Sequence, residues 1–169
     1  DGDNIRHGLN SDLGFGANER AENIRRISEV AKLFADAGVI VITSFISPYC
    51  RDRDFARKVH KDAGLDFIEI HINTPVDVCA TRDPKGLYAK ARKGDIKGFT
   101  GVDDPYEPPE KPELIVDTCK DDISCCIDKI VGYLDKKGLL SMIKVRERAA
   151  SPDVEVSSFV STNNTDQRR

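Results

Sequence analysis

Apolar residues recur at helical spacing between positions 18 and 37 and are followed by a continuous apolar run. The helical stripe repeats every three or four residues and consists of Ile24, Ile27, Ala31 and Phe34. Asn18 is a suitable N-cap for this helix, and Gly38 is a suitable residue to follow its last turn. The run VIVITSF at 39–45 is β-branched and apolar on both faces, which predicts a buried parallel strand.

The order of helix, glycine and strand then repeats. A shorter helix is predicted over residues 51–63, followed by Gly64 and by the strand FIEIHI at 67–72. The tripeptide Asp-Ala-Gly precedes both strands, which indicates two equivalent helix-to-strand turns. Three further elements are predicted, namely a helix at 76–82, a strand at 114–116 and a helix at 123–140.

This alternation predicts an α/β domain whose mostly parallel sheet is flanked by helices. A chain of 169 residues is long enough for one such domain with a hydrophobic core. We expect the domain to cover residues 1–140. Residues 141–169 lose the apolar periodicity, and we expect them to form a disordered tail.

The composition disfavours several classes of protein. The chain carries a formal net charge of −3, so it lacks the general basic surface of a nucleic-acid-binding protein. No apolar run approaches the ~18 residues of a membrane span. The five cysteines are odd in number and lack C-x-x-C spacing, which disfavours both a disulfide framework and a structural zinc site. Reduced thiols are typical of a cytoplasmic protein, and a nuclear location also fits.

Residues 82–101, RDPKGLYAKARKGDIKGFTG, form a basic stretch in an otherwise acidic chain. Six basic residues against two acidic ones give this basic stretch a charge of +4. Its glycines permit a close approach of the backbone to a ligand, or a hinge. We interpret it as a segment that moves onto an anion. A solvent-exposed helical face followed by a turn explains the same composition, so both interpretations stay open.

Ligands of a parallel α/β sheet collect beyond the carboxyl ends of its strands. Residues 1–4 have the pattern of a strand end, which places Asp3 at that edge of the sheet. The cations expected to surround one multiply charged anion there are Arg6, Arg20, Lys85 and Lys97. A carboxylate beside such cations stays ionised, which suits a group that orients or deprotonates a hydroxyl during phosphoryl transfer.

Several long motifs of this chain occur in the same order in a known family. The segments are DGDNIRHGLN, LGF, NERAENIRR, FISP, RDPKGLYAKARKGDIKGFTG and DDPYEPPEKPEL. Together they resemble adenylylsulfate kinase, which in animals is the kinase part of 3′-phosphoadenosine 5′-phosphosulfate synthase. The resemblance covers about residues 1–140. It implies a P-loop NTPase-type sheet flanked by helices, and a homodimer that binds ATP with Mg²⁺.

The implied reaction transfers the γ-phosphoryl group of ATP to the 3′-hydroxyl of adenosine 5′-phosphosulfate. Asp3 matches the residue that acts on this hydroxyl, and Phe15 and Phe99 match aromatic rings around the substrate adenine. The other matching substrate-binding positions are Asn4, Ile5, Arg6, Arg20, Asn23, Ile46, Ser47, Lys85 and Gly98. Arg82 and Cys126 match positions near the ATP adenine. Core packing for the two phenylalanines and a turn for Ser47 stay open as alternatives.

The phosphate-binding loop of the family, G-x-x-x-x-G-K-[ST], does not occur in these 169 residues. The resemblance implies that this loop lies before DGDN, on a strand between those at 39–45 and 67–72. We therefore expect a partial chain that is inactive by itself and has exposed or newly paired strand edges. Two alternatives stay open, a truncated isoform that only dimerises and another P-loop small-molecule kinase.

Overall fold

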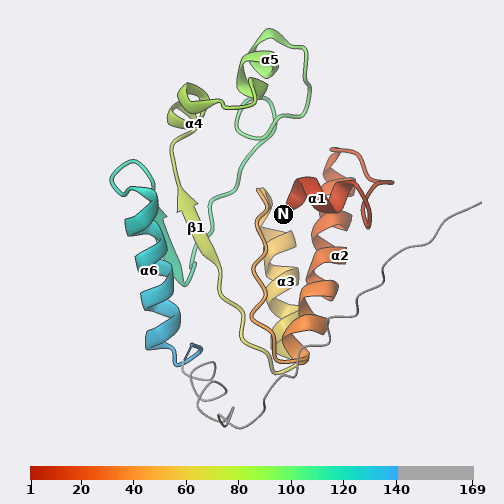
Figure 1. Cartoon of the computed structure of the whole chain (residues 1–169). Helices are drawn as coiled ribbons and strands as arrows, with labels where there is room; N and C mark the ends of the chain where they lie inside the picture. Colours follow the sequence, from red (N-terminus) through yellow and green to blue (C-terminus); the bar gives the residue numbers. More distant parts are fainter. Residues whose placement is uncertain (141–169) are drawn as a thin grey trace, which may run out of the picture. The chain divides into compact units, whose positions relative to one another are not determined.

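A computed structural model describes residues 1–140, and the tail expected at 141–169 lies outside the described residues. The chain divides into two units, Asp1–Lys129 and Ile130–Arg169, and every site residue predicted above lies in the first. The elements of Figure 1 are, in order, α1 Gly2–Arg6, α2 Ala17–Asp36, α3 Cys50–Asp62, β1 Ile70–Asn73, α4 Val76–Arg82, α5 Leu87–Lys93, β2 Leu114–Asp117 and α6 Ile123–Lys136.

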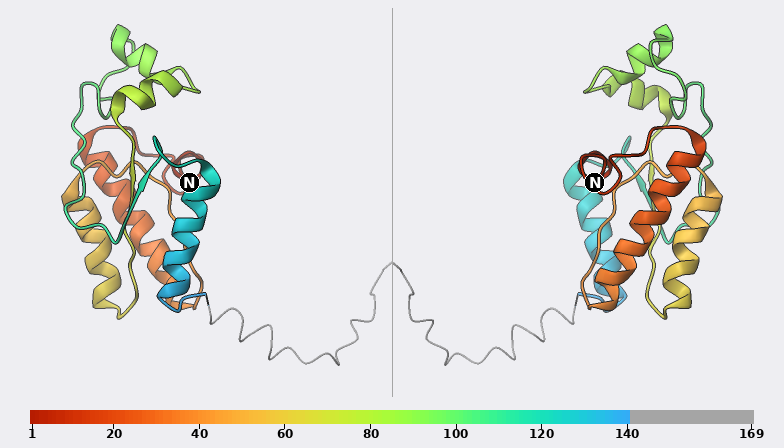
Figure 2. Two further views of the ribbon diagram at one scale, coloured as in Figure 1. Left: turned by 90° about the vertical axis from the view of Figure 1, so that its left-hand side faces the viewer. Right: turned by 90° about the vertical axis from the view of Figure 1, so that its right-hand side faces the viewer.

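Helix α2 lies close to its predicted position, but its N-cap is Gly16 rather than Asn18. The third helical residue, Glu19, explains the difference. Its carboxylate accepts hydrogen bonds from the backbone N–H groups of Gly14 at 2.8 Å and Gly16 at 3.0 Å, which is one half of a capping box. The buried positions are Asn23, Ile24, Ile27, Ser28 and Ala31. Helix α2 packs against α3 (Figures 1 and 2), whereas Phe34 from the predicted stripe is exposed.

The two Asp-Ala-Gly segments end their helices in the same way. The C-cap is Ala37 in α2 and Ala63 in α3, and each is followed by a glycine with positive φ. These angles are +82° at Gly38 and +70° at Gly64, a region that glycine adopts without steric cost. The predicted equivalence of the two turns is therefore confirmed.

Strands β1 and β2 form a parallel pair. Ile70 lies opposite Leu114 at one end of the register and Asn73 opposite Asp117 at the other. Val116 of β2 is completely buried. The predicted parallel sheet is confirmed, but it has only two strands within residues 1–140.

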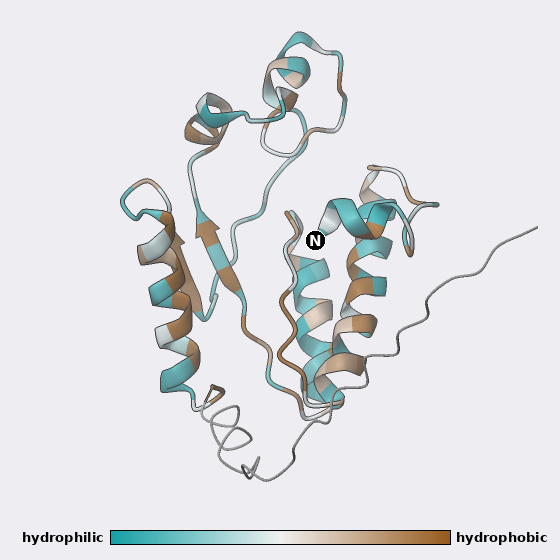
Figure 3. Ribbon diagram, in the orientation of Figure 1, coloured by the Kyte–Doolittle hydropathy of each residue, from teal (hydrophilic) through white to brown (hydrophobic). Residues whose placement is uncertain are grey.

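The predicted strand at 39–45 is wrong as a hydrogen-bonded element, because this segment pairs with no strand within the described residues. Three of its apolar side chains are instead exposed to solvent, namely Val39 to 52%, Ile40 to 44% and Ile42 to 84%. Figure 3 shows this hydrophobic segment between α2 and α3 in the chain. An apolar run specifies a preference for burial, whereas a strand also needs a neighbour for its backbone groups. The expected unpaired edge is therefore present here.

Residues 1–4 do not end a strand, because they begin helix α1. The Asp1 carboxylate accepts hydrogen bonds from the backbone N–H groups of Asp3 at 2.9 Å and Asn4 at 3.4 Å, and this N-cap favours a helical turn. Gly2 lies against the ring of Phe45, since a Cβ at Gly2 would stand 3.5 Å from two ring atoms. The first residues therefore lie beside Phe45, at the end of the segment 39–45. This position was expected, but a helix rather than the end of a strand provides it.

A network of charged side chains joins α3 to the beginnings of β1 and β2. Arg57 donates to both oxygens of Glu113 at 2.6 and 2.8 Å and to Glu69 at 3.2 Å. Arg53 donates to the other oxygen of Glu69 at 2.8 Å. The backbone N–H of Glu69 donates to Glu113 at 2.7 Å, so the network spans both strand starts. No periodicity in the sequence indicated these pairs.

Helix α4 has the predicted bounds, and the basic stretch contains the short helix α5. The last turn of α5 holds Lys90, Arg92 and Lys93, which are exposed as the alternative of a solvated helical face requires. Lys85 and Gly98, at either side of α5, instead contact the first residues of the chain and α2. The exposed last turn of α5 fits the solvated helical face, and movement of the basic stretch onto an anion stays a prediction. Among residues 1–140, none of the helices combines the length and apolarity that crossing a bilayer requires.

Candidate functional site

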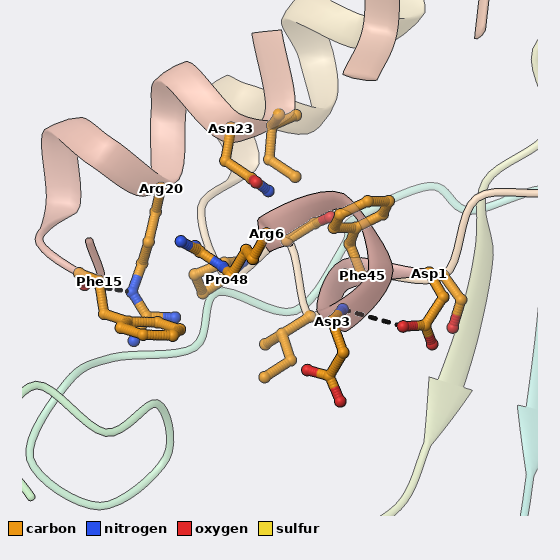
Figure 4. A pocket seen from close by; sticks show the side chains of 13 residues that line it. Asp1, Asp3, Arg6, Phe15, Arg20, Asn23, Phe45 and Pro48 are labelled. Atoms are coloured by element: carbon orange, nitrogen blue, oxygen red, sulfur yellow. Dashed lines mark hydrogen bonds between the residues drawn. The ribbon is translucent and has the colours of Figure 1, made fainter. Parts of the chain in front are cut away.

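Three segments of the first unit enclose a cavity of about 390 Å³ (Figure 4). They are residues 1–6, the turn and helix from 15 to 24, and residues 44–48. A cavity of several hundred Å³ is the usual size for a small-molecule site. Its charged lining residues are Asp1, Asp3, Arg6 and Arg20.

Arg6 lies between Asp3 and Arg20 in the cavity (Figure 4). Its Nη1 atom donates to the backbone carbonyls of Leu13 and Gly14, both at 2.9 Å. The guanidinium carbon stands 4.2 Å from the centre of the Phe15 ring, close enough for a cation–π contact. Arg6 therefore fixes the turn before α2 and holds its positive charge over an aromatic face.

Arg20 joins the start of α2 to the end of the basic stretch. Its Nε atom donates to the carbonyl of Phe15 and its Nη2 atom to the carbonyl of Gly98, both at 2.7 Å. The second bond spans 78 residues of sequence. Asp103 holds the same loop, because its carboxylate accepts the N–H groups of Gly98 at 2.9 Å and Phe99 at 2.7 Å. These backbone hydrogen bonds hold the pKa of Asp103 below its usual value.

Asp3 forms an ion pair with Lys85, which lies 82 residues further along the chain. The hydrogen bond and charge of Lys85, followed by weaker contributions from His7 and Arg6, lower the pKa of the Asp3 carboxyl. Asp3 is therefore ionised at neutral pH, as the sequence predicted for a carboxylate among cations. Both side chains are about two-thirds exposed, at 69% and 66%, so the pair is accessible to a ligand.

Asn23 lines the cavity although only 5% of it is exposed. Its Oδ1 atom accepts a hydrogen bond from Asn10 at 2.8 Å, and Asn10 is completely buried. This bond fixes the orientation of the Asn23 amide. Asn4 and Ile5 lie on α1 beside Asp3 but do not line the cavity.

The third wall of the cavity is an irregular segment that contains Ile46 and Ser47. Ile46 is 62% exposed. Ser47 has a φ of +44°, in the left-handed region that residues with a Cβ rarely adopt. Its carbonyl accepts a hydrogen bond from Arg53 at 2.6 Å. The alternative of a turn residue fits this backbone, although Ser47 also lines the cavity.

Five predicted residues of the basic stretch stay outside the cavity lining, namely Arg82, Lys85, Lys97, Gly98 and Phe99. Phe99 packs edge-on against Tyr88, with ring centres 5.0 Å apart. Phe15 lines the cavity and is 63% exposed. Among residues 1–140 these two phenylalanine rings make no contact with each other, so the two aromatic faces expected around an adenine are separate in this conformation.

The residues matched to the ATP side lie elsewhere in the first unit. Arg82 donates to the hydroxyl of Thr118 at 2.9 Å and to its carbonyl at 2.7 Å. The thiol of Cys126 lies 3.8 Å from the carbonyl of Asp121. Both contacts involve the loop after β2, and neither residue lines the cavity.

Divalent-metal ligands are sparse in the described part of the chain. Residues 1–140 contain no group of three or more His, Cys, Asp or Glu side chains arranged to hold a metal ion. Magnesium commonly binds through one or two carboxylates together with substrate phosphates and water. A magnesium ion held in this way would take most of its ligands from the nucleotide and from water.

Sequence reasoning missed several contributors to the site, and Phe45 and Glu19 are two of them. Phe45 lines the cavity next to Gly2, although its apolar run indicated a strand in the core. Glu19 and Arg6 together hold the turn that carries Phe15, by bonding its N–H groups and its carbonyls. An acidic residue three positions after a glycine N-cap was the available signal for Glu19.

Comparison with known proteins gives one family model and three similar proteins. A model of the adenylylsulphate kinase family matches residues 1–117. The adenylyl-sulfate kinase of Clostridium acetobutylicum is 60% identical over 140 residues, which are 83% of this chain and 68% of that protein. The Mycobacterium tuberculosis APS kinase CysC, solved in complex with AMPPNP and APS, is 51% identical with a TM-score of 0.77; the match covers 79% of this chain and 77% of that one. A hexameric APS kinase from Thiobacillus denitrificans is 32% identical, with a TM-score of 0.60 over 82% of this chain and 22% of that one.

Proposed function

The chain belongs to the adenylylsulphate kinase family, and from this premise we propose that its cavity binds adenosine 5′-phosphosulfate as the acceptor of a phosphoryl group from ATP. The family model and the similar structure confirm the family and the P-loop NTPase-type α/β fold that the motifs predicted. The relatives compared are bacterial, and the animal bifunctional arrangement stays a prediction. A cytoplasmic or nuclear location likewise stays a prediction.

The observation that carries this proposal is the convergence of Asp3, Arg6 and Arg20 on one cavity, with Lys85 bonded to Asp3. A phosphosulfate group carries several negatively charged oxygens, and guanidinium groups bind such oxygens with short, charge-assisted hydrogen bonds. Arg6 uses only its Nη1 atom for hydrogen bonds within the described residues, so its other nitrogens are available to an anion. Phe15 supplies an exposed aromatic face for the adenine ring.

Asp3 has the chemistry to hold the 3′-hydroxyl of the acceptor. Because Lys85 lowers the pKa of Asp3, the carboxyl group is ionised at neutral pH and its oxygens can accept a hydrogen bond from a hydroxyl. We assign it the role of orienting the hydroxyl oxygen towards the incoming phosphoryl group and taking its proton as the new bond forms. Lys85 would then stabilise the charge that gathers near this oxygen.

The ATP side rests on family membership rather than on the described residues. Mg²⁺ bound with ATP neutralises phosphate charge in such transfers. Residues 1–140 contain no group of three or more potential metal ligands, and we assign no residue and no step to the ion here. We keep the proposal that these 169 residues, which contain no G-x-x-x-x-G-K-[ST], do not transfer phosphoryl groups by themselves.

Isothermal titration of the 169-residue chain tests the proposal directly. We expect adenosine 5′-phosphosulfate to bind, and adenosine 5′-phosphate, which lacks the sulfate, to bind at least about tenfold more weakly, the effect of losing roughly one charge-assisted hydrogen bond. Equal affinity for both nucleotides, or a preference for another nucleoside monophosphate, would favour a different small-molecule kinase. No binding of any of them would refute the proposal.

We also propose that the chain forms homodimers, as the sequence resemblance implies. The hexameric state in the name of the Thiobacillus denitrificans structure shows that relatives assemble, without giving the number for this chain. Sedimentation velocity of the chain over a range of concentrations decides between monomer, dimer and larger forms. If dimers form with a complete adenylylsulfate kinase subunit while nucleotides do not bind, the alternative of a purely dimerising chain is favoured.

A further inference from the structure

Arg53, on α3, contacts the cavity wall from behind without lining the cavity. Its Nη1 atom donates to the carbonyl of Ser47 at 2.6 Å, and its Nε atom donates to Glu69 at 2.8 Å. Its Nη2 atom donates to the carbonyl of Glu107 at 2.6 Å and to the sulfur of Cys50 at 3.0 Å. With all three nitrogens engaged and 11% of the side chain exposed, Arg53 is held firmly in one place.

Ser47, whose carbonyl accepts a hydrogen bond from Arg53, has an unfavourable backbone conformation. Ser47 is the one residue other than glycine whose φ lies in the left-handed region among residues 1–140. A Cβ makes this region costly, so such a conformation persists only where surrounding contacts enforce it. The short hydrogen bond from Arg53 to the Ser47 carbonyl is such a contact.

Glu107 makes two hydrogen bonds to the residues that follow Ser47. Its N–H donates to the carbonyl of Pro48 at 2.8 Å, and its carboxylate accepts the N–H of Cys50 at 2.6 Å. Arg53 also bonds the Glu107 carbonyl, so one guanidinium fixes both the wall segment and its support. The wall at 46–48 is therefore shaped by groups that no ligand in the cavity touches.

We propose that Arg53 is a positioning residue, which holds the Ser47 backbone in the left-handed conformation that shapes the nucleotide-binding cavity. This inference rests on the proposed function for the identity of the nucleotide. It predicts that affinity for adenosine 5′-phosphosulfate depends on a side chain that does not contact it. It also predicts that this dependence acts through the backbone at 46–48 rather than through the stability of the whole fold.

The chain offers a matched control in Arg57. This arginine lies one turn further along α3 and shares the partner Glu69, but it bonds Glu113 and makes no hydrogen bond to residues 44–48. Replacing either arginine by alanine removes a cation from the same network. Only the change at Arg53 releases Ser47.

The experiment compares Arg53→Ala with Arg57→Ala in the 169-residue chain, by titration with adenosine 5′-phosphosulfate and by amide hydrogen exchange without ligand. We expect Arg53→Ala to weaken binding at least about tenfold and to speed exchange at 46–49, while Arg57→Ala changes affinity less than about threefold. If Arg53→Ala does not fold, Arg53→Lys replaces it. A lysine keeps the charge but reaches fewer of the four acceptors, so an intermediate loss of affinity is expected.

A double-mutant cycle with Ser47→Gly tests the conformational part. Glycine adopts positive φ without cost, so the loss of affinity caused by Arg53→Ala should shrink in the Ser47→Gly background. Equal affinities and equal exchange for the Arg53 and Arg57 variants would overturn the inference while leaving the proposed function intact. An unmutated chain that fails to bind the nucleotide would refute the proposed function, and faster exchange in Arg53→Ala alone would still support the positioning role.

Discussion

Replacing Arg57 by alanine tests how far the charged network stabilises the contact between α3 and the two strands. The substitution removes two short hydrogen bonds to Glu113 and a longer one to Glu69. It also leaves the Glu113 carboxylate, whose side chain is 27% exposed, without its cation. Breaking a partly buried ion pair costs more free energy of unfolding than breaking a fully exposed one.

The size of the effect follows from these contacts. Breaking a fully buried ion pair costs about 3–5 kcal/mol, and an exposed pair is worth about 0–1 kcal/mol. Because the two side chains are 31% and 27% exposed, solvent screening places the loss between these limits. We expect the free energy of unfolding to fall by about 2 kcal/mol, which corresponds to a Tm decrease of roughly 4–8 °C for a chain of this size.

The pH dependence gives a second readout. Hydrogen bonds from Arg57 hold the pKa of Glu113 below its usual value in the folded state, so the unfolded chain binds more protons in acid. The stability that the pair contributes is therefore present above the usual pKa of 4.5 and is lost as pH falls through the lower pKa of the folded state. Arg57→Ala should remove this part of the acid sensitivity.

Urea unfolding followed by circular dichroism, at neutral pH and between pH 5 and 3, measures both effects. Lys58→Ala is the control, since Lys58 lies on the same helix and pairs with Asp62 at the surface, with side chains 70% and 60% exposed. It should change the free energy of unfolding by less than about 0.5 kcal/mol. If Arg57→Ala costs no more than this control, the network does not stabilise the fold and the reasoning above is wrong.

Three further predictions concern the site and the exposed segment. Arg20→Ala should weaken binding of adenosine 5′-phosphosulfate at least about tenfold in calorimetry, because it removes a charged donor and frees the loop at Gly98; an unchanged affinity would exclude Arg20 from the site. Lys85→Ala should raise the pKa of Asp3 towards its usual value, observed by NMR titration of its carboxyl carbon, since Lys85 is the main cause of the lowered pKa; an unmoved titration would show that the pair is absent in solution. Ile42→Lys should reduce light scattering by concentrated samples, because an 84% exposed isoleucine in an unpaired apolar segment favours association; unchanged scattering would show that 39–45 does not mediate it.

Local patterns were enough to locate α2, α3, α4 and α6, but not α1. The spacing of Ile24, Ile27 and Ala31 placed α2 within a residue or two, because a helix bonds within its own segment. Glycine identified both helix ends for the same reason, since the steric advantage of positive φ is a property of one residue. The family was also identified from short motifs and their order along the chain, without any knowledge of tertiary contacts.

Strands and the site depended on distant partners. The run at 39–45 has the composition of a buried strand but no partner among the described residues, so its pattern predicted an element that does not form. The sequence named Asp3 and Lys85 as members of one cluster, yet only folding across 82 residues joins them. Nothing in the sequence pointed to Arg53, because its role depends on carbonyls from two loops.

The sequence by itself determined helices α2, α3, α4 and α6 and the family, since each follows from residues close together in the chain, and the alternation of helices and strands indicated a parallel sheet. The tertiary structure alone decided which strands pair, that α1 replaces a strand at residues 1–4, and how Arg53 supports the cavity wall. The physical reason is that these features need groups that only the folded chain brings together. Strands need partners for their backbone hydrogen bonds, and the strained backbone of Ser47 needs the hydrogen bond from Arg53.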